Sequence, residues 1–167
     1  MLDDFVLTNR KRKFQEFLTA IKKELKQPFP EQDFLDYMKL AETSPSHRDD
    51  SIQTVVRDVV WPMLNGTYLI ERDENGEAIS YASWGFFSEK VSLMKLELKK
   101  EKLVREDYGS GEIVWLLDVI AKPGFGPKKM IKKLLEKKEE LGLGKTEIRF
   151  RRWYATKNQE RINKVTK

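Results

Sequence analysis

One histidine occurs among the 167 residues, and it lies in the segment Ser44-Pro45-Ser46-His47-Arg48. The chain has no cysteine, so His47 is the only side chain whose unperturbed pKa, ~6.5, lies near neutral pH. His47 is therefore the first candidate for moving a proton at pH 7. The alternative is a histidine that caps a turn or lies solvated in a loop, with no catalytic role.

A second candidate is Asp118, which interrupts a nearly unbroken apolar run over residues 112–121. Such a run predicts a central strand that is buried on both faces. A carboxylate there is costly to bury unless it is paired or hydrogen-bonded. Asp118 could hold one imidazole nitrogen of His47 and leave the other nitrogen to accept a proton. Equally, it could be a structural aspartate that accepts backbone, tryptophan or tyrosine donors.

A Gly-x-Gly loop, Gly124-Phe125-Gly126, follows this strand and precedes a helix that is predicted over residues 127–141. The free amides of a glycine loop and a helix N-terminus can bind an anionic group. The loop lacks the longer pattern of dinucleotide or P-loop sites, so an ordinary strand-to-helix turn is the alternative interpretation.

Positive charge is concentrated in the C-terminal third. The whole chain has a net charge of +5, but residues 122–167 carry 15 Lys and Arg against 5 Asp and Glu. This asymmetry indicates an anionic partner, such as a nucleic acid, an acidic protein or a phosphate group. For the lysines of residues 128–138 the alternative is a solvated helix face.

The composition excludes several classes of site. Without cysteine there can be no disulfide, thiolate zinc site or cysteine nucleophile, and a single histidine disfavours a histidine-based metal centre. We therefore expect no metal site. No apolar run approaches the ~20 residues of a membrane span, and the first residues do not resemble a secretory signal. These features predict a packed cytoplasmic protein without a membrane span.

Helices and strands must bring these candidates together. Apolar periodicity predicts helices over residues 11–26, 31–41, 50–60, 89–103 and 127–141, with Asp49 or Asp50 as the cap of the third and Pro62 as its end. The Asn75-Gly76 turn predicts an antiparallel hairpin of strands 67–72 and 78–84. A later strand is expected over residues 145–154. The last eleven residues are expected to form a short helix or a frayed tail.

The motifs, taken in order, resemble those of bacterial toxin-activating lysine acyltransferases, which depend on acyl carrier protein and activate RTX toxins. Ser44-Pro45-x-His47-Arg48 is similar to the Ser-Pro-x-His-Arg signature of that family. The matches that follow are Pro62, Thr67-Tyr68-Leu69-Ile70, Ala82-Ser83-Trp84, Ser110-Gly111, Trp115-x-x-Asp118-x-x-Ala121 and Ile148-Arg149.

The resemblance implies an α+β fold of the GNAT acyltransferase type, with a mostly antiparallel central sheet flanked by helices. It places that domain at residues 34–156, after an N-terminal helical extension at 1–33 and before a basic tail at 157–167. It also implies catalytic roles for His47 and Asp118. Ser44, Arg48, Gly124, Gly126 and Arg149 are the residues that we expect to bind substrate.

The activity implied is transfer of a fatty acyl group from the phosphopantetheine thioester of acyl carrier protein to a lysine ε-amine of an RTX-type protoxin. No permanently bound cofactor is expected. His47 would act as base or as nucleophile, and Asp118 would orient it. Ser44 would hold the thioester carbonyl or cap its turn.

The implied partners are acyl carrier protein, the protoxin and a second copy of the chain in a homodimer. The acidic carrier protein would dock on Arg149, Arg151, Arg152 and the lysines of residues 128–138. Three alternatives stay open. One is a nucleic-acid-binding module, disfavoured for want of a recognition motif, in which Trp153 and Tyr154 would stack on bases. Another is an acetyl-CoA-dependent N-acetyltransferase of GNAT type, and the third is an inactive scaffold or immunity-type partner.

Overall fold

The computed structural model describes residues 12–13, 15–17, 19–20, 23, 28–144, 147–154 and 159–165, with the backbone alone for residues 152–154, 159–161, 163 and 165. The chain divides into two compact units, Met1–Pro30 and Glu31–Lys167. In the first unit the described residues between 12 and 23 are helical. The rest of the helix predicted over residues 11–26 lies outside the described residues.

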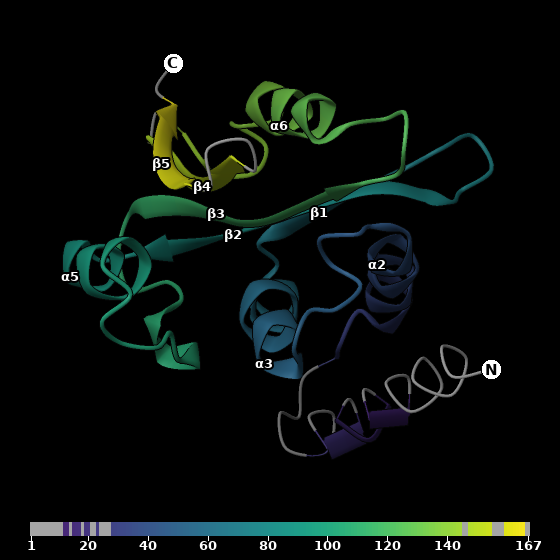
Figure 1. The fold of residues 1–167 in the computed structure, drawn as a ribbon, viewed down its shortest axis with the longest axis horizontal. Coiled ribbons are helices and arrows are strands. Elements are labelled where there is room, and N and C mark those ends of the chain that lie inside the picture. Colours follow the sequence, from purple (N-terminus) through teal and green to yellow (C-terminus); the bar gives the residue numbers. More distant parts are fainter. Residues whose placement is uncertain are drawn as a thin grey trace. The chain divides into compact units, whose positions relative to one another are not determined.

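The second unit is built on a five-stranded sheet whose strands lie side by side in chain order (Figure 1). The strands are β1 (Tyr68–Arg72), β2 (Ala78–Phe87), β3 (Ile113–Ala121), β4 (Ile148–Tyr154) and β5 (Gln159–Val165). Neighbouring strands are antiparallel except β3 and β4, which run parallel. The α+β class is thus confirmed with a mixed sheet, and the likeness to the GNAT fold stays a prediction.

Helices lie on both faces of this sheet, with α6 on one face and α2 and α3 on the other (Figure 1). The helical elements are α2 (Glu31–Thr43), α3 (Ile52–Val55), η1 (Val56–Val60), α4 (Trp61–Asn65), α5 (Glu89–Val91), η2 (Ser92–Glu97), η3 (Arg105–Asp107) and α6 (Pro127–Glu136). Because side chains alternate along a strand, Ala82 and Trp84 of β2 pack with α6. Tyr81 faces the opposite way and packs edge-on against Tyr37 of α2.

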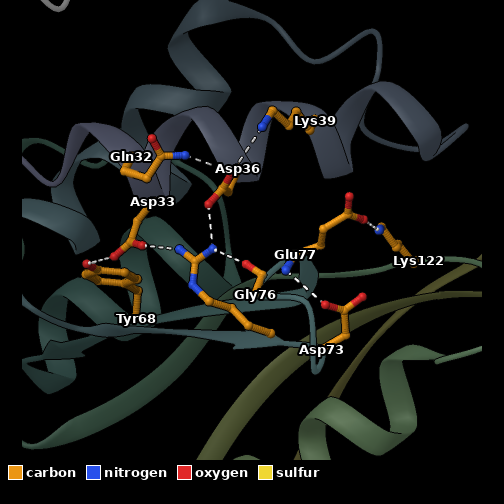
Figure 2. Close-up of polar contacts among 10 residues, drawn as sticks. Gln32, Asp33, Asp36, Lys39, Tyr68, Asp73, Gly76, Glu77 and Lys122 are labelled. Atoms are coloured by element: carbon orange, nitrogen blue, oxygen red, sulfur yellow. Dashed lines mark hydrogen bonds and ion pairs between the residues drawn. The ribbon is translucent and has the colours of Figure 1, made fainter.

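Helix α2 is fastened to β1 through the guanidinium of Arg72. Its Nη2 donates to Asp33 at 2.7 Å and its Nη1 donates to Asp36 at 2.6 Å. The hydroxyl of Tyr68 donates to the other oxygen of Asp33 at 2.7 Å, and Figure 2 shows both aspartates reaching from the helix toward the strand. Residues 33, 36 and 37 share one helix face, so this contact also fixes where Tyr37 lies.

The helix predicted over residues 50–60 does not end at Pro62. It begins at Ser51, whose hydroxyl accepts from the amide of Thr54, and it continues through a π-helical segment, η1, into α4, with Pro62 in the first turn. Gly66, with a φ of 69°, ends the helix, because glycine adopts this left-handed conformation without strain.

Pro62 is tolerated because the carbonyls that lose a helical partner find other donors. Proline has no N–H to give to the carbonyl four residues earlier, which belongs to Asp58, and the hydroxyl of Ser83 donates to that oxygen instead. The amide of Trp61 donates to the carbonyl of Val56 in the π-helical pattern. This leaves the carbonyl of Arg57, which accepts from the hydroxyl of Tyr108.

The hairpin prediction is confirmed by the antiparallel pairing of β1 and β2. Its turn closes through a bond from the amide of Gly76 to the carbonyl of Asp73, and Gly76 has the positive φ, 79°, that Asn-Gly turns favour.

The prediction of helix over residues 89–103 is wrong beyond Glu97. Leu98 ends the helical segment, and Lys99 has a left-handed φ of 51°, which an α-helix does not accommodate.

The C-terminal segment is a strand, and the expectation of a short helix or frayed tail is wrong for residues 159–165. β5 pairs antiparallel with β4 from Tyr154↔Gln159 to Ile148↔Val165. A strand with an unpaired edge presents free amides and carbonyls, and β5 satisfies those of β4. The basic C-terminal segment therefore belongs to the sheet, a long-range pairing that periodicity within the segment does not reveal.

Candidate active site

His47 lies in a tight turn between α2 and α3. The carbonyl of Ser44 accepts from the amides of His47 at 3.1 Å and Arg48 at 3.0 Å, and the carbonyl of His47 accepts from the amide of Asp50 at 3.1 Å. These bonds satisfy the backbone locally, as turns require. The turn follows directly on α2, so the fastening of α2 to the sheet also places the imidazole.

Asp118 lies on β3, beside an irregularity in its pairing with β2. Ser83 pairs with Asp118, but the next residue, Trp84, pairs with Leu116, so Leu117 has no partner. Such a β-bulge places two successive residues on one face of the strand. Leu116 packs with α6 on one face of the sheet, whereas Asp118 contacts Tyr37 of α2 on the other.

The structure brings His47 and Asp118 together across 71 residues of sequence, with Nε2 of the imidazole 2.9 Å from Oδ1 of the carboxylate. Both side chains are largely covered, with 16% and 11% of their surfaces exposed. A carboxylate accepts only, so Nε2 carries a proton and Nδ1 of the neutral ring is the acceptor.

Two hydroxyls lie at Nδ1, that of Ser44 at 2.8 Å and that of Ser46 at 2.9 Å. The neutral nitrogen has one lone pair, so one hydroxyl donates to it at a time. The serine oxygens are 3.1 Å apart and can donate to each other. Serine, histidine and aspartate thus form a continuous hydrogen-bonded chain, of the kind that activates a nucleophile or relays a proton.

The second oxygen of Asp118 accepts a hydrogen bond from the hydroxyl of Tyr37 at 3.1 Å. Burial, together with the negative charge of Asp118, raises the pKa of Tyr37 far above its ordinary value. The phenol therefore stays protonated and acts as a donor across the whole working pH range. Both oxygens of the carboxylate have a partner, which offsets the penalty for covering the charge.

The charge state of His47 reflects opposing effects. Burial of the ring by itself lowers its pKa, but the hydrogen bond to Asp118 and the charges of Asp118, Asp50 and Asp58 outweigh it, so the pKa of His47 lies above its ordinary value. An imidazole held between a carboxylate and two hydroxyls is suited to take up a proton and release it again.

Asp58 is a buried carboxylate beside this pair. Burial raises its pKa to about 6 although Arg57 opposes the shift, and the charges of Asp118 and Asp50 add to the rise. Nε of Arg57 donates to Asp58 at 2.6 Å. An acid that titrates near neutrality beside a histidine is common at functional sites.

The remaining residues predicted to bind substrate lie elsewhere or have internal partners. Arg48 is exposed and lies 3.5 Å from Asp49 in an ion pair. Arg149 is paired with Glu97 at 2.8 Å and with Glu147 at 2.7 Å. Their roles in binding stay predictions.

Gly124 and Gly126 lie in the loop between β3 and α6. Both have positive φ values, 89° and 77°, and a Cβ at either position would meet no atom within 4 Å. The loop therefore needs glycine for its backbone conformation, and open space lies beside it. Whether an anionic group binds there stays a prediction.

Three residues of the site were not predicted from the sequence: Tyr37, Ser46 and Asp58. Ser46 adjoins His47, and that was an available signal. Tyr37 and Asp58 lie in helical segments with ordinary amphipathic sequence, so no local pattern identified them as site residues.

No group of three His, Cys, Asp or Glu side chains in the described part of the chain could hold a metal ion. No helix among the described residues has the length and apolar character to cross a bilayer.

Comparison with known proteins identifies the family of this chain. The model of the family described as "HlyC: RTX toxin acyltransferase family" matches residues 34–167. The chain is also 27% identical over 110 residues to the RTX-II toxin-activating lysine-acyltransferase ApxIIC of Actinobacillus pleuropneumoniae. That alignment covers 61% of this chain and 61% of the relative, so the chain spans about three fifths of the relative's length. The family match includes His47, Asp118 and every strand of the sheet, and this chain belongs to the RTX toxin acyltransferase family.

Proposed function

We propose that this protein is a cytoplasmic lysine acyltransferase of GNAT-like fold, which moves a fatty acyl group from acyl carrier protein to the ε-amine of an internal lysine in an RTX-type protoxin. The observation that supports this most strongly is the 2.9 Å contact between His47 and Asp118, within the region that the family model matches. The name of the relative, a toxin-activating lysine-acyltransferase, supports lysine as the acceptor.

In this proposal His47 is the base. The ε-amine of the acceptor lysine has an ordinary pKa of ~10.4 and must lose a proton before it attacks. Nδ1 takes that proton, because Nε2 already carries one toward Asp118. The amine attacks the thioester carbonyl, the C–S bond breaks, and the departing thiolate receives a proton. Asp118 holds the ring in one tautomer and stabilises the imidazolium that forms.

The serine hydroxyls decide how the proton reaches Nδ1. With Ser44 and Ser46 both within 2.9 Å of it, the amine must either displace a hydroxyl or pass its proton through one. A nucleophilic route, in which Nδ1 itself takes the acyl group first, would also require the hydroxyl to move aside. Ser44 can in addition donate to the thioester carbonyl once the substrate is bound.

The donor would bind at surfaces that the charge distribution favours. We place the phosphopantetheine beside Gly124 and Gly126, where the loop leaves open space. The acidic carrier protein would meet the basic C-terminal third. Several basic groups there have internal partners, since Lys133 pairs with Glu71 and Arg149 with Glu97. The exposed lysines of α6, such as Lys128 and Lys129, are better placed for this docking.

The test is a reconstituted transfer with the purified chain, a protoxin fragment and either acyl-carrier-protein thioester or acetyl-CoA. We expect lysine acylation of the fragment with the carrier-protein donor. His47→Ala should lower the rate by about 10²- to 10⁴-fold, the usual contribution of a general base, whereas Glu139→Gln on the exposed end of the lysine-rich segment should not.

Three results would contradict the proposal. Consumption of acetyl-CoA alone would favour an ordinary N-acetyltransferase. Tight, salt-sensitive binding of random DNA or RNA without any transfer would favour a nucleic-acid-binding module. Full activity in His47→Ala would remove the base from the mechanism. Sedimentation of the active protein tests the expected homodimer.

A further inference from the structure

Tyr37 contacts the candidate active site from the helix side of the sheet. Its side chain is buried, with 1% of the residue exposed, and its hydroxyl lies 3.1 Å from Oδ2 of Asp118. The other oxygen, Oδ1, lies 2.9 Å from His47. Each carboxylate oxygen therefore has its own donor, the imidazole at Oδ1 and, at Oδ2, a phenol that stays protonated.

The position of the phenol is fixed by its surroundings. The ring of Tyr37 packs edge-on against the ring of Tyr81, with centroids 4.9 Å apart and an interplanar angle of 65°. Arg72 holds α2 through Asp33 and Asp36, the two acidic side chains that Figure 2 shows on this helix. The hydroxyl thus meets Asp118 from a preorganised position.

From this geometry we infer that Tyr37 is a positioning residue for the proposed acyl transfer. Its hydroxyl holds Oδ2 of Asp118, so that Oδ1 stays directed at His47 and only part of the carboxylate charge acts on the imidazole. The effect on catalysis rests on the proposed function. The coupling of Tyr37 to His47 through Asp118 does not, and it can be measured in the absence of any substrate.

The sign of the coupling follows from the direction of the hydrogen bond. The phenol points its proton at the carboxylate, and this positive end of the dipole opposes the charge of Asp118 at the imidazole. Removal of the hydroxyl leaves that charge less compensated, which should raise the pKa of His47. The other groups that act on the site are Asp50 in the turn, Asp58 on η1 and Tyr81 on β2, and all three remain in the variant.

The experiment is an NMR titration of the imidazole C–H signals, which are unambiguous because the chain has one histidine. Tyr37→Phe should raise the midpoint of that titration relative to the unmodified protein. The matched control is Tyr68→Phe. It removes a tyrosine hydroxyl that also donates to an aspartate, Asp33, at 2.7 Å, but it leaves Asp118 and both bonds of Arg72 intact, so the midpoint should not move.

The kinetic readout separates positioning from packing. Tyr37→Phe should lower kcat about tenfold, as for a lost hydrogen bond to a charged group, with little change in KM, because no substrate contact is lost. An unchanged or lowered midpoint, or an equal shift in Tyr68→Phe, would overturn the inference. If the midpoint rises but no variant transfers acyl groups, the proposed function fails while the coupling stands.

Discussion

At the scale of single residues, the behaviour of the site depends on the partners of one imidazole. Nε2 faces Asp118 and Nδ1 faces Ser44 and Ser46, so neither nitrogen is open. This arrangement fixes which nitrogen carries the proton, whereas a neutral histidine in water exchanges between two tautomers. In the proposed mechanism Nδ1 accepts the proton, and the substrate amine must displace a serine hydroxyl or pass its proton through one.

The pH dependence of the reaction should follow from this environment. The base acts when it is neutral, so the rate should rise with pH through the pKa of His47, which lies above its ordinary value. In Asp118→Asn the carboxylate charge is gone, and burial then lowers the pKa of His47. The midpoint of the pH–rate profile should therefore move to lower pH, while the maximal rate falls about 10²-fold. Profiles of kcat/KM between about pH 5 and pH 9 measure both effects.

Asp49→Asn is the matched control for that profile. Asp49 lies in the same turn, but its side chain is 86% exposed and its charge is not among those that raise the pKa of His47. Its profile should coincide with that of the unmodified chain. An acid limb of Asp118→Asn at the same pH or higher would contradict the assignment of His47 as the titrating base.

Asp58 should make stability depend on pH. Burial raises its pKa to about 6, so the folded chain holds a proton that the unfolded chain releases near the ordinary pKa of ~3.9. The free energy of unfolding should therefore fall as the pH rises through this interval. Asp58→Asn removes the charged form, so urea unfolding should show it more stable than the unmodified chain at pH 7, with the difference shrinking toward pH 4.

A buried aspartate with a different role provides the contrast. Asp107 pairs with Lys95 at 2.7 Å and also accepts from the amide of Val104 at 2.8 Å. Asp107→Asn weakens both contacts, and we expect it to lower the free energy of unfolding at pH 7 by about 1–3 kcal/mol.

If the free energy of unfolding varies with pH in the same way for Asp58→Asn and the unmodified chain, the titration of Asp58 is ruled out.

At the scale of elements, the site depends on how α2 is fixed to the sheet. Arg72 binds two carboxylates of α2, and the helix in turn carries Tyr37 and leads into the turn of His47. The side chain of Arg72 is 32% exposed, so solvent screens the attraction. The contact therefore acts more on the orientation of the helix than on overall stability.

Arg72→Met should lower the free energy of unfolding by only about 1 kcal/mol but should reduce kcat by several-fold. If the loss acts through Tyr37, the effects of Arg72→Met and Tyr37→Phe on kcat will not add in the double variant. Arg72→Lys retains the charge but cannot bind both carboxylates with one planar group. Its kcat should lie between those of the unmodified chain and Arg72→Met. Additive losses in the double-mutant cycle would show that Arg72 acts by another route.

At the scale of the whole molecule, the distribution of charge separates two roles. The catalytic candidates lie in the N-terminal part and on β3, where acidic residues are frequent, while residues 122–167 carry the excess of positive charge. A partner that is attracted to the basic segment would be steered by charge without contact with the imidazole. Long-range attraction of this kind acts on the rate of association.

Association with acyl carrier protein should accordingly slow steeply with added salt. Between about 0.01 and 0.15 M salt the screening length falls from ~30 to ~8 Å, and the association rate should fall by at least tenfold while the dissociation rate changes little. Stopped-flow fluorescence measures both. Lys128→Glu, a charge reversal on the exposed face of α6, should reduce the salt dependence, and a rate that is flat with salt would exclude electrostatic docking.

Much of this protein could be predicted from its sequence because the signals are local. The Asn75-Gly76 turn predicted a hairpin, the apolar run around Asp118 predicted β3, and the unique histidine drew attention to the turn after α2. These features depend on neighbouring residues, and the structure contains each of them. The motifs also predicted the family, which the match over residues 34–167 confirms.

The tertiary structure alone decided which way Asp118 points. Strict alternation would place it with Val114 and Leu116, which pack against α6, and away from His47. The unpaired Leu117 shifts the register and turns Asp118 to the opposite face. A bulge is a property of two paired strands, and β2 lies more than thirty residues away in the sequence. For the same reason only the tertiary structure showed the contact of Tyr37 with Asp118 and the strand β5. Each depends on a partner elsewhere in the chain that the local sequence pattern does not identify.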